Sequence, residues 1–332
     1  MTPFRFTPLL KTPLWGGRDI VAVKGITNHK TVGESWEISG LKGEETIVSE
    51  GPDTGKNLVQ LIEQYGAALM GAENLQRYGK DFPLLIKFIS AAQPLSIQVH
   101  PDDEMAQKLE NAPYGKSEMW YVVDTHEGAS LYNGFKETLS LEAFDQATAE
   151  HRLSEHLARY NTQAGDCFFI PAGQIHSIGS GNFIIEIQQS CNLVYRVCDF
   201  NRVDANGQKR ELHLEQARKA LNFETRSDYQ SHYTPRENER ILLEQHAEFT
   251  TGLYHLTQPL RADYSHLDSF VIFIAFAGTA RLTDGHGHSL TLRAGESILF
   301  PAENAFVDIE PIGETRFSCI ETYVDPSERP KP

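Results

Sequence analysis

The chain has 332 residues, of which 40% are hydrophobic and 23% are charged, and its formal net charge is −15. This length and composition are typical of a globular protein with about two domains and a sizeable core. The negative charge argues against a surface that binds nucleic acid or anionic lipid, so an anionic substrate would need a locally positive pocket.

The N-terminal residues show no signal-peptide pattern. The longest apolar run, residues 270–277, is far shorter than the roughly 20 residues of a membrane span. The four cysteines lack the spacing of a zinc ribbon or a disulfide scaffold, which predicts buried free thiols. We therefore expect a cytoplasmic protein that binds neither nucleic acid nor membrane.

Turn-forming residues dominate the first 55 positions, with one expected strand at residues 35–38. Asn57 predicts the cap of a helix that begins at Leu58, and a second helix is expected at residues 72–78. Acidic residues after Pro101 predict the first turn of another short helix, because they face the positive end of its dipole.

From residue 83 onward the pattern changes to strands. Residues 83–90 form a nearly continuous apolar run that is interrupted by Lys87, and we expect this run to form a hairpin with the strand at residues 95–100. That second strand alternates strictly, which predicts one packed face and one polar face. The apolar face holds Leu95, Ile97 and Val99, and the polar face holds Ser96, Gln98 and His100.

Further strands are expected at residues 118–123, 129–135, 166–170, 182–189 and 194–200, with helices within residues 140–160 and near residues 212–221. Residues 223–240 are polar and turn-prone, which is typical of a linker. Residues 241–324 have the pattern of strands and turns, with a hairpin at Asp284 and Gly285.

One sequence frame occurs twice. The two copies are Gly165, Pro171, Gly173, His176 and Gly295, Pro301, Glu303, Phe306. In each copy a strand enters a proline turn that begins the next strand, which indicates an internal duplication.

We therefore expect a mainly β protein with two consecutive antiparallel barrels of jelly-roll type and a few peripheral helices. The expected division is an N-terminal metal-binding domain at residues 1–222, a linker at 223–240, and a C-terminal domain without metal ligands at 241–332.

Four side chains of the first barrel form a candidate metal site. Gln98 and His100 are two positions apart on a strand and project to the same side, while Glu118 lies early in the next long strand and His176 follows a tight turn. Two imidazoles, a carboxylate and an amide suit Zn²⁺, and the two imidazoles with the carboxylate also suit Fe²⁺ or Mn²⁺. The residues alone leave the metal open.

Three blocks of the chain carry a specific resemblance. Residues 93–103 (QPLSIQVHPDD), 115–120 (GKSEMW) and 171–176 (PAGQIH) resemble the signature blocks of type I mannose-6-phosphate isomerases, members of the cupin superfamily. This resemblance implies one zinc ion per chain, with Gln98, His100, Glu118 and His176 at the matching ligand positions. It also implies the interconversion of mannose 6-phosphate and fructose 6-phosphate.

Glu186 and Arg196 are candidate catalytic residues. In the strand at 182–189 the neighbours Ile185 and Ile187 take the opposite face from Glu186, so its carboxylate points away from their packing. The resemblance supports the pair, because a Glu ten residues before an Arg matches the family. Arg196 would stabilise negative charge on an enediolate or on phosphate.

The remaining site predictions follow from strand faces and from the resemblance. Lys116 shares a face with Glu118 and matches a family lysine, which makes it a third catalytic candidate. Ser96 and Lys87 are predicted to contact substrate. The family pattern expects an Asp at position 192, but this chain has Asn192; an amide cannot act as a base, so we assign it only a substrate contact.

The first hypothesis is therefore a zinc-dependent aldose-ketose isomerase that acts on a phosphosugar through an enediol, as a monomer or weak homodimer. One alternative is a metal-containing cupin that binds a sugar phosphate without turnover. Another is a cupin oxygenase that uses iron or manganese.

Overall fold

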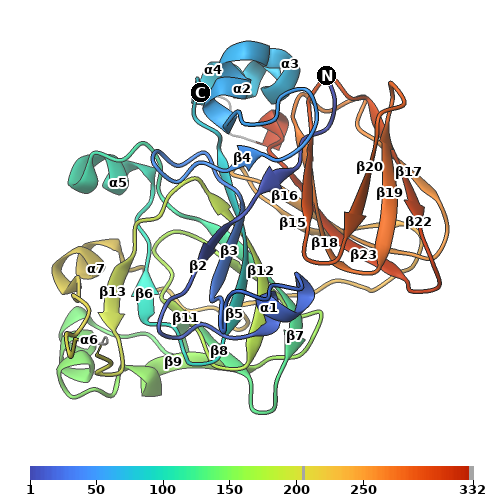
Figure 1. Cartoon of the computed structure of the whole chain (residues 1–332). Helices are drawn as coiled ribbons and strands as arrows, with labels where there is room; N and C mark the ends of the chain where they lie inside the picture. The colour runs from blue at the N-terminus through green and yellow to red at the C-terminus, as the bar shows by residue number, and fades with distance from the viewer. Residues whose placement is uncertain (204–205, 329–332) are drawn as a thin grey trace.

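The structure is a computed structural model that describes residues 1–203 and 206–328. It is built mainly from antiparallel sheets, and two β bodies follow each other along the chain (Figure 1). The mainly β prediction is confirmed. Within the described residues, no helix is long and apolar enough to cross a membrane.

The first body pairs a seven-stranded sheet with a five-stranded sheet. The larger sheet has the order β14 (Gln230–Ser231), β10 (Cys167–Ile170), β7 (Glu118–Thr125), β12 (Asn182–Gln189), β5 (Leu84–Ala91), β3 (Glu34–Ile38), β2 (Leu9–Lys11). The smaller sheet has the order β13 (Tyr195–Cys198), β6 (Ile97–Val99), β11 (His176–Ile178), β8 (Ser130–Phe135), β9 (Leu157–Asn161). A shared apolar cluster, which includes Trp120 of one sheet and Leu131 of the other, packs them face to face.

The second body repeats this arrangement with shorter sheets. One sheet has the order β15 (Arg240–Gln245), β16 (Thr250–Leu256), β23 (Phe317–Tyr323), β18 (Val271–Ala277), β21 (Ser297–Phe300). The other has the order β17 (Leu260–Asp263), β22 (Phe306–Pro311), β19 (Thr279–Asp284), β20 (Ser289–Arg293). Phe273 and Val307, from opposite sheets, belong to the cluster that fills the space between them. A separate small sheet joins β1 (Phe6–Thr7) to β4 (Ile47–Val48).

The helices lie around the sheets (Figure 1). They are α1 (Asp19–Val23), α2 (Leu58–Tyr65), α3 (Ala67–Met70), α4 (Ala72–Tyr78), α5 (Asp103–Glu110), α6 (Leu141–Ala149) and α7 (Leu214–Ala220), with short 3-10 turns at Leu153–His156 and Pro326–Glu328. Asn57 caps α2 as predicted, since its side chain accepts from the backbone N–H of Gln60.

The predicted hairpin between residues 83–90 and 95–100 is wrong. β5 lies between β12 and β3 in the seven-stranded sheet, whereas β6 lies between β13 and β11 in the other sheet. All eight residues of β5 are buried, as befits a strand covered on both faces. The turn before Leu95 therefore carries the chain from one sheet across to the other.

The predicted helical stretch at residues 140–160 ends earlier than expected. After α6 and a 3-10 turn, residues 157–161 form the edge strand β9, which pairs with β8. In an edge strand with one solvated face, apolar residues alternate with polar or charged ones. Over only five residues, this alternation is hard to distinguish from the pattern of a helix surface.

The two bodies share apolar contacts. One cluster joins Ile86 and Met119 of the first body to Ile272 and Ile320 of the second. The N-terminal segment also crosses to the second body, because Phe4 pairs with Leu299. We propose the division into residues 1–222, 223–240 and 241–332 as a division into barrels, not into independent cores, with the linker adding β14 to the first sheet.

Asp268, which precedes β18, caps a helix of the other body. Its two carboxylate oxygens accept from the backbone N–H groups of Ala72 and Glu73 at 2.9 and 3.0 Å, at the start of α4. We expect Asp268→Ala to lower the free energy of unfolding by about 1 kcal/mol, measured by urea denaturation. Asp268→Asn should lose only part of this stability, because its amide keeps one acceptor oxygen where the carboxylate uses two; equal stability of all three proteins would contradict the prediction.

Candidate metal centre and active site

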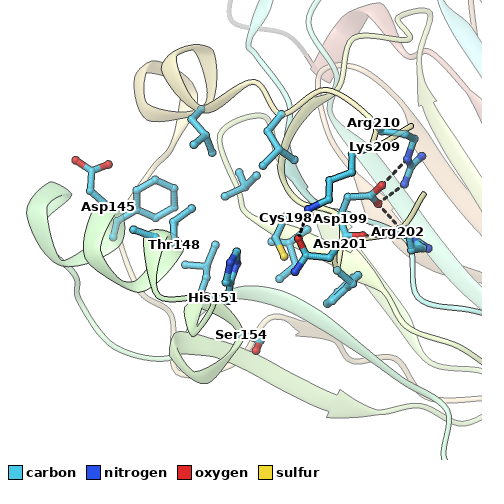
Figure 2. A pocket seen from close by; sticks show the side chains of 18 of the residues that line it. Asp145, Thr148, His151, Ser154, Cys198, Asp199, Asn201, Arg202, Lys209 and Arg210 are labelled. Carbon is cyan, nitrogen blue, oxygen red and sulfur yellow. Dashed lines mark hydrogen bonds and ion pairs between the residues drawn. The ribbon is translucent and has the colours of Figure 1, made fainter. Parts of the chain in front are cut away.

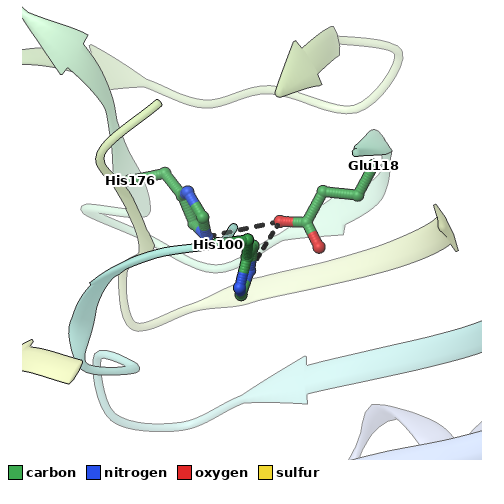
Figure 3. A group of neighbouring side chains, drawn as sticks. All are labelled: His100, Glu118 and His176. Atoms are coloured by element: carbon green, nitrogen blue, oxygen red, sulfur yellow. Dashed lines mark ion pairs between the residues drawn. The ribbon is translucent and has the colours of Figure 1, made fainter. Parts of the chain in front are cut away.

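Three buried side chains from three strands of the first barrel point toward one another (Figure 3). His100 directly follows β6, Glu118 begins β7, and His176 begins β11. Oε1 of Glu118 lies 3.3 Å from Nε2 of His176 and 3.7 Å from Nε2 of His100. The ligand atoms all lie within 4.8 Å of one another. The sequence thus predicted a group of side chains that the fold does bring together.

The backbone fixes the proton position on both imidazoles. Nδ1 of His100 lies 2.8 Å from the carbonyl oxygen of Leu193, and Nδ1 of His176 lies 2.8 Å from that of Gln174. A carbonyl can only accept, so each Nδ1 carries the hydrogen and each Nε2 presents a lone pair to the centre. This is the arrangement that holds histidine ligands of metal sites in their orientation.

The side-chain atoms that face the centre, two imidazole nitrogens and the Glu118 carboxylate, are therefore all hydrogen-bond acceptors, and none of them carries a hydrogen. Within the described residues, neither Nε2 of His100 nor Oε1 of Glu118 has a hydrogen-bond partner. Buried acceptors without partners are costly, and a cation between them removes that cost. The residues present therefore fit a divalent metal ion.

Electrostatics keep these groups in the protonation states that bind metal. Burial, reinforced by the nearby Lys116, lowers the pKa of His100 to about 3, and burial also lowers the pKa of His176. Burial alone would raise the pKa of Glu118, but Lys116 and the two neighbouring imidazoles together outweigh burial and hold that pKa well below its usual range. Neutral imidazoles and an ionised carboxylate are the ligand forms that metal binding requires.

Gln98 is the fourth predicted ligand and lies beside His176. Its Nε2 is 3.3 Å from Nε2 of His176, and its Oε1 accepts from the hydroxyl of Ser96 at 3.1 Å. The two ends of an amide have nearly the same shape, so a half-turn of the amide would present the oxygen to the centre. Gln98 can then contribute oxygen while Ser96 accepts from its N–H.

A chain of alternating charges runs from the centre into an adjoining pocket. Nζ of Lys116 lies 2.7 Å from Oε2 of Glu118 and 3.7 Å from Oε1 of Glu186. Lys87 continues the chain, with Nζ 3.0 Å from Oε1 of Glu186 and 3.7 Å from Oε2 of Glu34. Each lysine is buried between two carboxylates, which compensates the cost of desolvating the charges.

Glu186 is held from a second side by Trp120, whose indole N–H donates to Oε2 at 3.0 Å. The two residues are cross-strand partners on β12 and β7, and Lys87 is the partner of Glu186 on β5. All of these contacts are ones that a carboxylate anion makes. Cross-strand register thus places the two residues that orient Glu186.

The same pocket carries two arginines. It is lined by Ser96, Gln98, Lys87, Lys116, Glu186, Asn192, Arg196 and Arg210, together with Glu34, Trp15 and several aliphatic residues. Arg196 donates through Nη1 to the carbonyl of Glu211, and its buried Nε has no partner among the described residues. Burial, together with the nearby Arg210, lowers the pKa of Arg196. An anion placed here would relieve that cost.

A second cavity, of about 430 Å³, lies on the other face of β6 and β13. Figure 2 shows the side chains that line it. Ile97 and Val197 line it, whereas their neighbours Gln98 and Arg196 face the first pocket, as alternation along a strand requires. Arg210 lines both spaces and is paired with Asp199. Asp199 also binds Arg202, so one carboxylate fixes two arginines at this wall. The metal candidates do not line this cavity.

The sequence did not single out Arg210, Glu34, Trp120 or Asp199 for the site. Arg210 lies in the loop between β13 and α7, where no periodicity predicts the direction of a side chain. Trp120 and Glu34 lie on strands, but their closeness to Glu186 and Lys87 depends on cross-strand register. The only available signal was Lys87 itself, a charge within an apolar run that needed a buried partner.

The chain is similar to known proteins over most of its length. The family model described as phosphomannose isomerase type I, catalytic domain, matches residues 4–134. The probable mannose-6-phosphate isomerase GmuF of Bacillus subtilis is 31% identical over 93% of this chain and 96% of its own length. Mannose-6-phosphate isomerase ManA of the same organism is 31% identical over 90% of this chain and 93% of its own.

Among solved structures, the mannose 6-phosphate isomerase from Bacillus subtilis superposes with a TM-score of 0.85 and 26% identity. The match covers 97% of this chain and 99% of that one, so the shared fold includes both barrels.

Proposed function

The chain belongs to the type I phosphomannose isomerases, and from this premise we propose that it interconverts mannose 6-phosphate and fructose 6-phosphate. We propose one zinc ion per chain and an enediol intermediate. The observation that carries the proposal is the cluster of buried acceptors from His100, Glu118 and His176 beside a pocket that holds a carboxylate and two arginines.

Zinc would be held by His100, Glu118 and His176, with Gln98 as fourth ligand. A bound zinc ion would polarise the sugar carbonyl and stabilise the negative charge that develops on its oxygen. Two nitrogen ligands and two oxygen ligands suit zinc, and this ligand set supports the choice of metal.

Glu186 is the proposed base. The reaction moves one proton between C2 and C1 of the open-chain sugar and another between the two oxygens, so a carboxylate that accepts and returns the first proton is sufficient for the carbon step. Lys87 and Trp120 orient Glu186 from opposite oxygens. Lys116 lies between Glu186 and Glu118 and would stabilise negative charge on the substrate oxygens.

Arg196 and Arg210 are the proposed phosphate contacts. Both line the pocket that contains Glu186, and planar guanidinium groups match the geometry of phosphate oxygens. Asp199 holds Arg210 in place, and Ser96 and Asn192 complete the wall as donors to sugar hydroxyls. These cations would attract an anionic substrate locally although the chain as a whole is acidic.

The cysteines bear on where the enzyme works. All four cysteines are free thiols, as in proteins of the reducing cytoplasm, and we propose that location. We propose a monomer or weak homodimer, and light scattering of the purified protein tests that assignment.

The direct test is conversion of fructose 6-phosphate to mannose 6-phosphate by purified protein reconstituted with zinc. Turnover is expected. Tight binding of mannose 6-phosphate without turnover would instead support a metal-containing sensor, and iron or manganese as the only activating metal would contradict the zinc assignment.

Asn192 gives a prediction with a small effect. The residue is exposed at the pocket, and a neutral amide neither gives nor takes a proton at neutral pH, so we expect Asn192→Ala to change kcat by less than about tenfold. Any loss should appear in KM. Steady-state kinetics in the fructose 6-phosphate direction provide the measurement, and a fall in kcat of about a hundredfold would contradict the assignment.

A further inference from the structure

The two barrels can be aligned residue by residue through their strand pairing. Gly165 and Gly295 both adopt positive φ angles, of 96° and 83°, and each lies two residues before the strand that leads into the repeated proline turn, β10 or β21. The third residue after each glycine, Phe168 or Ile298, is paired across the sheet with Trp120 or Phe273 respectively. These pairs anchor the comparison.

On the next strand of each sheet, β12 or β23, the residue paired with Trp120 or Phe273 is a buried glutamate. Glu186 pairs with Trp120, and Glu321 pairs with Phe273. The complete cross-strand rows are Phe168, Trp120, Glu186, Lys87 and Ile298, Phe273, Glu321, Gly252. Glu321 therefore occupies in the second barrel the position of the proposed base in the first.

The pocket around this position is repeated as well. Arg240 pairs with Tyr254 as Glu34 pairs with Ile89, and both strand pairs have an irregularity at the same place. Asp263 pairs with Phe306 as Gln98 pairs with His176. Arg240, Tyr254, Leu260 and Asp263 line a cavity of about 330 Å³, and their counterparts Glu34, Ile89, Leu95 and Gln98 line the candidate active site.

The cavity of the second barrel lacks the metal-ligand residues of the first barrel. Val271 holds the position of Glu118, since each faces the last residue of the equivalent strand, Phe300 or Ile170. Phe306 holds the position of His176. A valine and a phenylalanine offer no ligand atoms, so the chemistry of this pocket cannot be that of the first.

A different polar network has been built in its place. Glu321 is fully buried; its Oε1 is paired with Arg240, and its Oε2 accepts from the hydroxyls of Tyr254 and Tyr264. Gly252 makes room for this pair, because a Cβ there would lie 2.9 Å from both Nε of Arg240 and Oε1 of Glu321. Gly252 stands at the position equivalent to Lys87, and the space that a side chain would fill there is occupied by Arg240 of the neighbouring strand β15.

The charges around the cavity indicate what it can hold. Arg240 is paired with Glu321, and Arg261 is paired with Asp308 at 2.7 Å while its guanidinium lies 3.9 Å from the ring centre of Phe306. Glu239 and Asp263 add negative charge. With its cations neutralised, the cavity does not favour a phosphate group.

Its remaining groups suit hydroxyls. Tyr323 is half-buried and offers aromatic surface, whereas Tyr254 and Tyr264 line the cavity but are almost wholly buried. Arg240 keeps Nη1 without a partner among the described residues, and about a third of its side chain is exposed. We propose that the second barrel binds a neutral, sugar-sized polyhydroxy compound in this cavity, at the site equivalent to the catalytic pocket. The inference rests on register and charge, and not on the isomerase activity.

The test is calorimetric titration of the zinc-loaded full chain with D-mannose and with mannitol. We expect one site per chain that Arg261→Ala weakens about tenfold, by loss of a charged donor. Arg281→Ala is the matched control. Arg281 pairs with Glu310, which lies on β22 as Asp308 does, but Arg281 does not line the cavity. Gly252→Ala should weaken binding at least as much by displacing Arg240.

Variants of the first barrel separate this site from the catalytic one. His176→Ala should leave the binding of D-mannose and mannitol unchanged, and Arg261→Ala should leave isomerase activity unchanged. Absence of heat with both compounds, equal affinity of Arg261→Ala and Arg281→Ala, or loss of binding in His176→Ala would each overturn the proposal.

Discussion

Replacing Glu186 by glutamine is expected to lower kcat by about a thousandfold while the protein still binds one zinc ion per chain. Removal of a positioned general base costs on the order of 10² to 10⁴ in rate. Glutamine has nearly the same shape and can still accept from Lys87 or Trp120, so the pocket should keep its form. Steady-state kinetics and metal analysis of the same preparation provide the measurement.

Glu34→Gln is the matched control for this variant. Glu34 is a carboxylate of the same pocket with the same lysine partner, and it also accepts from an indole N–H, that of Trp36 at 2.7 Å. It lies at the far end of the charge chain from Glu118, so we expect kcat to fall less than about tenfold. Equal losses in both variants would mean that the pocket responds to total charge, and would remove Glu186 as the base.

His176→Ala is expected to release the metal and reduce activity to below about 1% of the parent. Changes to the groups behind a metal ligand already cost about 10- to 100-fold in affinity, so loss of the ligand itself should cost more. Competition with a chromophoric zinc chelator measures the affinity. Circular dichroism shows whether the variant is folded.

His126→Ala is the control for that experiment. His126 is exposed and pairs with Asp19 at 2.9 Å, away from the candidate centre. It should keep zinc affinity and activity at the parental values. A folded His176→Ala protein that retained one tightly bound zinc and normal turnover would show that the cluster at His100, Glu118 and His176 is not the metal site.

Local pattern was a good guide where local geometry decides the outcome. The alternation at residues 95–100 predicted that Ile97 and Val99 pack and that Gln98 and His100 face the other way, and both apolar side chains are in the core. The cap at Asn57 is equally local. Side-chain direction along a strand depends only on the backbone, and a single sequence contains that information.

Features that depend on the pairing of distant strands could not be predicted in this way. The sequence pattern pairs the apolar run at residues 83–90 with its sequence neighbour, although its partners in the structure are β12 and β3. The contact of Trp120 with Glu186 has the same origin, because register is fixed by packing of whole sheets. Arg210 could not be predicted because it lies in a loop.

The two barrels share more equivalent positions than the repeated sequence frame indicates. The frame identified the loss of His176 at Phe306, which led to the expectation of a second barrel without metal ligands. It did not show that Glu321 stands at the position of Glu186, because the spacing between the strands differs in the two barrels. Strand register conserves the geometry that sequence spacing obscures.

The most direct test of the account is a zinc titration of metal-free protein with activity as the readout. Protein stripped by a chelator should be inactive toward fructose 6-phosphate, and mannose 6-phosphate formation should rise linearly with added zinc until it reaches a plateau at one ion per chain. Full activity in the stripped protein, or no activity at any zinc concentration, would contradict the proposal that this chain is a zinc-dependent isomerase.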